Sequence, residues 1–566
     1  MRATGSQLGA ASSSVRAVLA NAGLRRIVAG WGGGIAGDNT LLIALLVVAF
    51  QQGGAIAVGL LGVIRLAPSV VVAPLAGNLA GRYPPTRLLL AVQAIRAIAA
   101  VVTVLVLMIG AGLPLIFLVN AVGATAGALV RPFQAAALPS LAGTPGELVA
   151  ANVALATSEG LGSFGGPLIA GILLATSGPL AAAIAGASLF GIASLSMVGL
   201  GANADDEAEV AAGLRAREAL AERRTAGGRF SGLTAGIRVM RRRPGAAAII
   251  AGFGGQVVTR GLMNTLITVA AIRLIGLGEP GVGTLNAAFG LGTLIGAIAS
   301  VGLTSRQRLG PAFAVSLAMW GLPLGVIGAV PWPIVAFAAM FVSGAANGTE
   351  DVAGLTLLQR AVPTAERMTV FGILEATVSL GMGLGSILGP LLIAQFGDQG
   401  ALAIAGAILP IVAVATWPRI HRIDDEVVVP AEQLTILRGA PMFARLPLTA
   451  LERIAEAMRA VPYAPETEIV REGETGDAYL IVGSGRVEVS QGGRPIDELG
   501  PGEGFGEIAL LHAMPRTATV RAIEPSTIYT IACHVFLEAV AGPTSAAVAN
   551  RVAAERLARA PASNPG

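Results

Sequence analysis

The chain contains no lysine, because all 38 of its basic residues are arginine. This excludes every mechanism that needs a lysine amine, such as a lysine-containing phosphate loop or a Schiff base. The single cysteine, Cys533, excludes an internal disulfide framework and a cysteine-rich metal site, and three scattered histidines disfavour a histidine cluster. No nucleophile, base and orienting residue form a recognisable set. We therefore expect no metal site and no enzyme activity.

Charged residues are also few, at 13% of the chain, whereas hydrophobic residues make up 54% and the mean hydropathy is +0.73. Such a composition belongs mostly in a lipid bilayer. Apolar runs of about 20 residues, the length that crosses a bilayer, recur from about Ile27 to about Trp417. We predict an α-helical membrane protein with twelve transmembrane helices in two six-helix halves, over 27–50, 56–80, 88–109, 113–138, 148–175, 180–200, 246–273, 281–303, 311–329, 332–358, 368–396 and 400–417.

Arginine distribution predicts the orientation of these spans. The polar interruption from Ala202 to Arg243 carries nine arginines, and three other even-numbered breaks carry arginine too, at Arg82 and Arg87, at Arg306 and Arg308, and at Arg360 and Arg367. Cytoplasmic loops are enriched in basic residues, so both termini should lie in the cytoplasm of a bacterium whose plasma membrane holds the protein. The same rule accounts for a pI near 9.9 without nucleic-acid binding, which we do not expect. The predicted parts are a tail (1–26), a first half (27–200), a loop (201–245), a second half (246–420), a linker (421–432) and a C-terminal domain (433–560).

An internal repeat supports the division into halves. The segment GLGSFGGPLI at Gly160 aligns without gaps to GLGSILGPLL at Gly383, 223 residues later. Segments that recur at equivalent positions are expected of two membrane halves related by an axis along the membrane normal. The fifth and eleventh spans are therefore predicted counterparts.

The layout resembles the major facilitator superfamily over about Arg25 to Ile420, and two motifs carry the resemblance. The first is GNLAGRYPPTR, between the second and third spans, where Gly81 replaces the aspartate usual in that family. The missing acid would remove a latch that holds the cytoplasmic side shut. The second is a glycine-proline pattern in the fifth span that is similar to the signature of export members, with ordinary glycine packing as the alternative. The predicted gating residues are Gly77, Gly81, Arg82, Arg87, Gly162, Gly166 and Pro167.

Ionisable residues within the spans are candidates for the transport pathway, because charge in lipid is unfavourable. Asp38 is the expected proton carrier, and the alternative is a static ion pair such as Asp38 with Arg131. The resemblance thus implies a proton-coupled exporter of an apolar or amphipathic small molecule or lipid, similar to the branch of siderophore, macrolide and lysophospholipid transporters. The predicted pathway residues are Asp38, Arg131, Glu159, Glu350, Asp351 and Glu375.

After Arg422 the chain becomes charged and mixed, which predicts short helices followed by an α+β domain of short strands with glycine turns, a β-roll. Within it, FGEIALLHAMPRTATV spans Phe505 to Val520. Glu507 can accept a hydrogen bond from the ribose 2′-hydroxyl of a cyclic nucleotide, and the planar guanidinium of Arg516 can donate two parallel hydrogen bonds to its phosphate. Small residues at Gly506 and Ala509 would let backbone amides at the start of a short helix approach that phosphate.

This block resembles the cyclic nucleotide-binding domain of catabolite activator proteins, kinase regulatory subunits and gated channels. The resemblance implies a regulatory cyclic nucleotide, with cyclic AMP (cAMP) preferred and cyclic GMP (cGMP) the alternative, and a closing lid at Val548 to Leu557. Ligand binding would shift the balance between inward-facing and outward-facing states. The implied nucleotide-binding residues are Gly506, Glu507, Ile508, Ala509, Arg516, Thr517 and Ala518.

Two rival interpretations remain at this point. A cyclic nucleotide-gated channel is disfavoured because no selectivity-filter loop is visible. A membrane receptor that responds to cyclic nucleotide without net transport stays open, as does the choice between a monomer and a homodimer.

Overall fold

The computed structural model describes residues 20–80, 82–142, 145–200, 238–300, 309–362, 364–426, 431–444, 446, 448–512 and 514–540. They belong to two compact units, a helical unit that ends at Asp424 and a unit of strands and short helices that follows it. The predicted lid at 548–557, most of the predicted loop and tail, and Gly81 lie outside the described residues.

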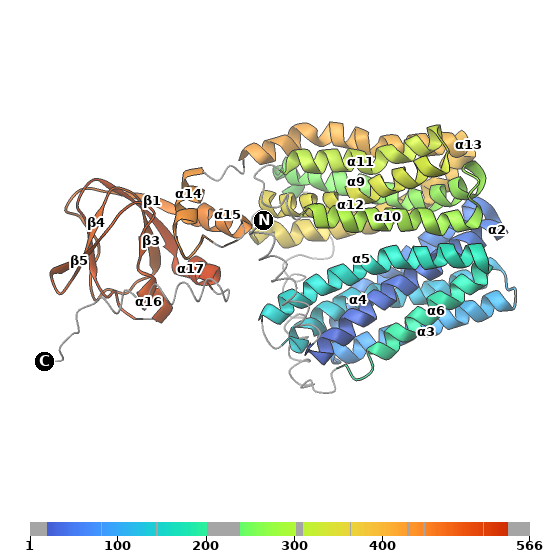
Figure 1. The fold of residues 1–566 in the computed structure, drawn as a ribbon, viewed down its shortest axis with the longest axis horizontal. Helices are drawn as coiled ribbons and strands as arrows, with labels where there is room; N and C mark the ends of the chain where they lie inside the picture. The colour runs from blue at the N-terminus through green and yellow to red at the C-terminus, as the bar shows by residue number, and fades with distance from the viewer. Residues whose placement is uncertain are drawn as a thin grey trace. The chain divides into compact units, whose positions relative to one another are not determined.

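The helical unit consists of long apolar helices that pack along one another (Figure 1). Their lengths follow from the apolar runs, and several begin at a proline, which fixes a helical φ and lacks the amide hydrogen that a first turn leaves unpaired. The helices are α2 (Ala22–Ala80), α3 (Pro85–Met108), α4 (Leu113–Leu141), α5 (Pro145–Thr176), α6 (Gly178–Ser196), α9 (Pro244–Val269) with the π-helical turn η1 (Ala270–Leu274), α10 (Gly278–Ser300), α11 (Gly310–Ala329), α12 (Pro333–Ala361) and α13 (Thr364–Glu426).

Nine helices in the described part of the chain are long and apolar enough to cross a membrane. Two of them contain a break in helical geometry, α2 at Gly53 and Gly54 and α13 at Gly397, and each break falls between two predicted spans. The tenth long helix, α12, has 29 residues and carries charged groups in its second half. The helical membrane class is confirmed, while the count of twelve spans stays a prediction.

Glycines set the helix spacing within each half. A methyl group on Gly162 or Gly166 of α5 would lie against the backbone of α2, 2.9 Å from the Gly32 carbonyl oxygen and 2.5 Å from that of Ala36. Of the equivalent residues of the repeat in α13, Gly385 meets the backbone of α9 in the same way, and Gly389 faces the side chain of Thr265 on α9. The sequence repeat thus recurs as one packing arrangement in both halves.

The two halves meet along α5 and α10, which lie side by side (Figure 1). A methyl group on Gly171 would lie 2.9 Å from the backbone nitrogen of Thr284, and one on Gly290 would lie 2.6 Å from the carbonyl of Ser163. A second contact joins α2 to α13, where Gly62 faces Ser386. Small residues therefore also allow the backbones of opposite halves to touch.

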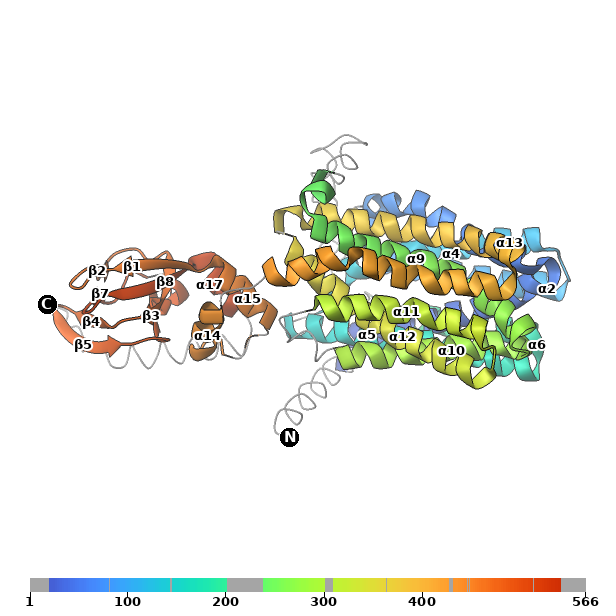
Figure 2. The ribbon, with the colours of Figure 1, turned by 90° about the horizontal axis from the view of Figure 1, so that it is seen from above.

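The second unit is a roll of two four-stranded antiparallel sheets, with strand orders β1-β8-β3-β6 and β2-β7-β4-β5. Helices α14, α15 and α17 gather at one end of the roll, away from β5 (Figure 2). The elements are α14 (Ala431–Gly439), α15 (Leu448–Ala457), β1 (Arg459–Tyr463), β2 (Glu468–Val470), β3 (Ala478–Ser484), β4 (Val487–Gln491), β5 (Arg494–Leu499), β6 (Gly504–Phe505), α16 (Glu507–His512), β7 (Thr519–Ala522), β8 (Ser526–Ala532) and α17 (Cys533–Val540).

The side chains on the two faces of β3 pack into two different hydrophobic cores. Leu480 and Val482 pack inside the roll with Phe505 and Val520, whereas Tyr479 points to the helices. There its ring stacks on Phe536, with centroids 4.7 Å apart. The roll and its helices therefore share a strand and form one folded unit.

Two neighbouring glycines of α5 test the packing argument. A methyl group on Gly166 would collide with α2, whereas one on Gly165 would meet nothing within 4 Å. Overpacking costs about 1–3 kcal/mol, while alanine in open helix positions gains up to about 1 kcal/mol over glycine. We expect Gly166→Ala to lower the melting temperature of the detergent-purified protein, and Gly165→Ala to maintain or raise it. Equal melting temperatures for the two variants would contradict close contact at Gly166.

Candidate functional site

A cavity of about 140 Å³ opens inside the β-roll. All seven residues predicted to bind nucleotide line it, and strands β2, β4, β5 and β7 complete its wall. The lining consists of Val470, Val489, Gln491, Ile496, Asp497, Leu499, Phe505, Gly506, Glu507, Ile508, Ala509, Arg516, Thr517, Ala518 and Val520.

Arg516 is the cation of this cavity and is only 7% exposed. Its Nη1 donates to the Gly506 carbonyl at 3.0 Å and its Nη2 to the Ala478 carbonyl at 2.7 Å. Its own backbone pairs with the 473–474 turn, through its amide to the Glu474 carbonyl and through its carbonyl to the Gly473 amide, both at 2.8 Å. The guanidinium is therefore held in place by main-chain groups.

Two glycines make room for this guanidinium. Gly506 has a φ of +92°, which side-chain-bearing residues rarely adopt, and a methyl group there would collide with Nη1 of Arg516. A methyl group on Gly476 would lie 2.6 Å from the Arg516 Cζ. Gly476 was not predicted as a site residue, because only its contact with Arg516 in the folded chain identifies it as one.

Carboxylates surround the same cation. Burial lowers the pKa of Arg516, while Asp477, Glu507 and Glu474 oppose that shift. Glu507, the first residue of α16, is 1% exposed and lines the cavity with Arg516. The helix α16 has only six residues, so a ligand at its start would be bound by individual backbone amides rather than by a helix dipole. The cavity thus offers a buried acceptor next to a buried cation.

The rest of the wall is mostly apolar. Val470, Val489, Leu499 and Val520 come from four different strands, and they form a surface suited to a flat ring. Polar groups interrupt this surface at Gln491, Asp497 and Thr517. Gln491 and Asp497 escaped the sequence prediction because they lie in a β-hairpin without a recognisable motif.

Comparison with known proteins agrees with this geometry. Residues 256–462 match the family model described as Major Facilitator Superfamily, and residues 460–542 match the one described as Cyclic nucleotide-binding domain. The membrane part of the chain thus matches the major facilitator superfamily over residues 256–462, and the chain carries a C-terminal cyclic nucleotide-binding domain. These matches confirm the predicted families and the fold class. The helical unit is called the facilitator domain below, and the unit of strands and short helices is called the nucleotide-binding domain.

Known relatives match only parts of this chain. It is 34% identical to an uncharacterized protein of Mycobacterium tuberculosis over 169 residues, 29% of this chain and 32% of that protein. It is 38% identical to a cAMP-dependent protein kinase regulatory subunit of Yarrowia lipolytica over 88 residues, 15% of this chain and 24% of that one. The chain spans about a third or less of the length of these relatives.

A solved structure of the regulatory domain of Toxoplasma gondii PKA with cAMP is 29% identical to this protein. The match covers 23% of this chain and 47% of that chain, with a TM-score of 0.19.

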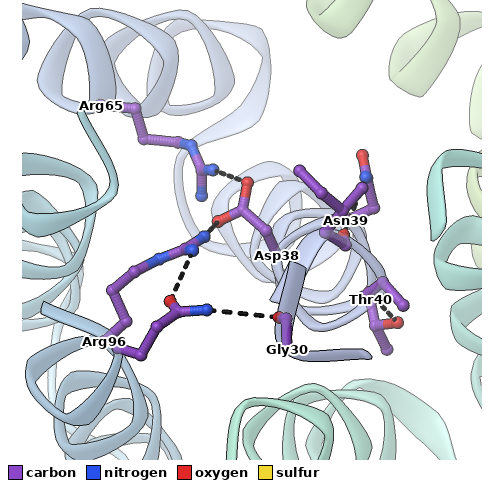
Figure 3. Close-up of polar contacts among 9 residues, drawn as sticks. Gly30, Asp38, Asn39, Thr40, Arg65 and Arg96 are labelled. Atoms are coloured by element: carbon purple, nitrogen blue, oxygen red, sulfur yellow. Dashed lines mark hydrogen bonds and ion pairs between the residues drawn. The ribbon is translucent and has the colours of Figure 1, made fainter. Parts of the chain in front are cut away.

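In the first half of the facilitator domain, Asp38 lies between two arginines (Figure 3). Its Oδ2 is 2.7 Å from Nη2 of Arg65, and its Oδ1 is 3.4 Å from Nη2 of Arg96. Arg96 also donates to Gln93, which donates in turn to the Gly30 carbonyl at 3.3 Å. Asp38 thus holds a partly buried ion-pair network with one excess positive charge.

The pair suggested from the sequence, Asp38 with Arg131, is wrong. Arg131 pairs instead with Glu159, and its side chain is 69% exposed. Arg131 on α4 and Glu159 on α5 are 28 residues apart, and spacing along the sequence does not show which arginine the helix packing brings to which acid.

In the second half, Asn347 of α12 joins several polar groups. Its Oδ1 accepts hydrogen bonds from Trp320 Nε1 at 2.8 Å and Gln256 Nε2 at 3.0 Å, and its Nδ2 donates to Asp351 at 3.3 Å. Arg260 lies near this group, above the ring of Phe289. None of the three neutral residues was predicted, because asparagine, glutamine and tryptophan in a helix carry no motif.

Glu350, next to this network, is 0% exposed. Neither of its carboxyl oxygens has a hydrogen-bond partner among the described residues. Glu375 of α13, by contrast, is exposed. The predicted pathway residues therefore do not form one cluster: Asp38 is paired, Glu350 is buried and Glu375 is at the surface.

The predicted gating residues fall into two groups. Gly77 lies within α2, and Arg82 and Arg87 are exposed at the turn into α3. Gly162 and Gly166 pack α5 on α2, and Pro167 lies one residue further along α5. Thr40 donates to the Gly166 carbonyl at 3.0 Å, which strengthens the same helix contact. The structure gives the second group a packing role, and their role in export stays a prediction.

The Asp38 network has a testable consequence for stability. Asp38→Asn would leave Arg65 and Arg96, whose side chains are only 17% and 8% exposed, facing each other without an anion, which should destabilise the protein more than the loss of an exposed pair. Glu159→Gln should change little, since exposed pairs contribute about 0–1 kcal/mol. We expect a clear drop in melting temperature for the first variant alone, and partial recovery in Asp38→Asn with Arg65→Gln. A drop of the same size for Glu159→Gln would contradict this account.

Proposed function

We propose that the protein is a secondary transporter whose activity is regulated by a cyclic nucleotide, preferably cAMP, bound in the β-roll. The observation that carries this proposal is the cavity in which Arg516 and Glu507 lie together, within a chain whose membrane part is a facilitator domain. A fixed guanidinium suits a singly charged cyclic phosphate, and a buried carboxylate suits a ribose hydroxyl. The apolar wall suits the purine.

In this proposal the phosphate of the ligand replaces the two backbone carbonyls as the hydrogen-bond acceptor of Arg516. The guanidinium already points to two carbonyl oxygens, and a phosphate would offer it charged acceptors instead, which are roughly twice as strong. Release of Gly506 and Ala478 then changes the start of β3 and the loop before α16. This local change is the proposed origin of regulation.

The transported cargo is proposed to be an apolar or amphipathic molecule, moved outward. The glycine- and alanine-rich membrane helices, in which charged residues are few, support the cargo class. The glycine-proline pattern of α5 supports the direction. Contacts between the halves at Gly171 and between Gln51 and Glu279 lie at the end of the bundle predicted to face outward, so this conformation is proposed to be inward-facing.

Glu350 is the proposed proton carrier, in place of Asp38. Asp38 already has two cationic partners, whereas the carboxyl of Glu350 is buried without a hydrogen-bond donor from the described residues. A carboxylate in such a place is strongly unfavourable unless it is neutral or gains a partner. Exchange between these conditions would couple a proton to the conformational cycle.

Titration with cyclic nucleotides tests the regulatory site. We expect the full-length protein in detergent to bind cAMP, and Arg516→Ala to weaken binding by about 100-fold, the loss of a charge-assisted pair of about 3 kcal/mol. Arg521→Ala is the matched control, because Arg521 lies on β7 outside the cavity lining. Unchanged cAMP binding in Arg516→Ala would disprove the assigned site. Lack of binding in the unsubstituted protein would disprove the regulatory proposal.

Transport in proteoliposomes tests the membrane function and its coupling. We expect a pH gradient to drive cargo in the unsubstituted protein, and cAMP to change that rate except in Arg516→Ala. Glu350→Gln should lose the response to the gradient and retain exchange of labelled cargo, whereas Glu375→Gln, which removes an exposed carboxylate, should retain both. Absence of cargo exchange would favour the receptor alternative, and an intact gradient response in Glu350→Gln would remove Glu350 as the carrier.

A further inference from the structure

The nucleotide cavity has one polar side chain without an assigned role at the end of β4. Gln491 is the last residue of β4 and lines the cavity. Its Oε1 is buried and has no hydrogen-bond partner among the described residues. Leaving a buried acceptor unpaired costs about 1–3 kcal/mol, so such an atom in a cavity wall points to a donor supplied by a ligand.

The position of Gln491 assigns it to the base. Arg516 and Glu507 provide the groups for phosphate and ribose, and the remaining wall consists mostly of apolar strand residues. Val489, two residues before Gln491, lines the cavity beside Val520, its partner in β7. A purine lying on these side chains has its faces covered by carbon, so its edge must find polar groups beyond them. Gln491 is the amide on that part of the wall.

The chemistry of this edge favours an amino group over a carbonyl. A glutamine amide places an acceptor and a donor side by side, which matches the amino group and adjacent ring nitrogen of adenine. Asp497, the cross-strand partner of Val489, adds a second acceptor to the same wall. Its Oδ1 already accepts the Glu498 amide at 3.0 Å, and its negative charge would repel the 6-carbonyl oxygen of guanine.

We propose that Gln491 binds the 6-amino group of adenine through Oε1 and thereby selects cAMP over cyclic nucleotides that lack this group. This inference rests on the proposed function, since it requires a cyclic nucleotide in the cavity. It adds a specificity-determining residue on β4, outside the segment that carries Glu507 and Arg516.

A ligand comparison tests the proposal without any substitution. Competition binding to the full-length protein would compare cAMP, cGMP and purine riboside 3′,5′-cyclic monophosphate, which lacks only the 6-amino group. One hydrogen bond to a buried acceptor corresponds to about a tenfold difference in Kd. We expect cAMP to bind about tenfold more tightly than the analogue without the amino group, and more tightly than cGMP. Equal affinity for cAMP and the analogue, or tighter binding of cGMP, would overturn the proposal.

The variant Gln491→Leu tests the residue itself. It should weaken cAMP about tenfold more than it weakens the analogue, which keeps the ring nitrogen and lacks the amino group, so that the preference disappears. Gln433→Leu on α14, outside the cavity lining, should leave all affinities unchanged. Equal weakening of both ligands would indicate a merely structural role and reject the proposal. If the unsubstituted protein binds no cyclic nucleotide, the proposed function fails as well. Binding that depends on Arg516 but not on Gln491 rejects this inference alone.

Discussion

Direct backbone contact at glycine holds the facilitator domain together. In lipid, burial of apolar side chains gives helices little reason to associate, so close packing must supply the attraction. Gly162 and Gly166 provide it between α5 and α2, and Gly385 provides it between α13 and α9. The same kind of contact at Gly171 and Gly290 joins the halves. A seam of this kind can separate without exposing a large apolar surface to water, which suits halves that rock against each other.

The lengths of the apolar runs predicted the long helices of the membrane part well, because a bilayer imposes such lengths directly on the sequence. The orientation inferred from the arginines stays a prediction. The end of α13 was less predictable. The last span was expected to finish at 417, yet the helix continues to Glu426, since residues that are too polar for lipid still form a helix. The break at Gly53 and Gly54 fell where a turn was expected, and its glycines give the reason, because Gly54 has a φ of +60°.

Partners of buried charges could not be predicted. Asp38 contacts Arg65, beyond the break in α2, and Arg96 of α3, and no periodicity states which helical segments will be neighbours. In the β-roll the opposite holds for Glu507 and Arg516, because a short segment carries both residues and its motif fixes their separation. Gly476 and Gln491 lie outside that segment, and only the folded chain brings them to the cavity. The local motif therefore predicted that Glu507 and Arg516 share one site, and tertiary structure was needed to find the rest of the cavity wall.

The lone thiol of the protein lies in an informative place. The Cys533 amide donates to the Asp477 carbonyl at 2.8 Å, and the next residue, Ala478, gives its carbonyl to Arg516. Cys533 is half-buried and begins α17, so a change at the guanidinium needs to pass through only two adjacent residues to reach it. A fluorophore or spin label attached to this sulfur would need no engineered cysteine and no removal of others. The chain thus carries a built-in attachment point for observing its nucleotide-binding domain.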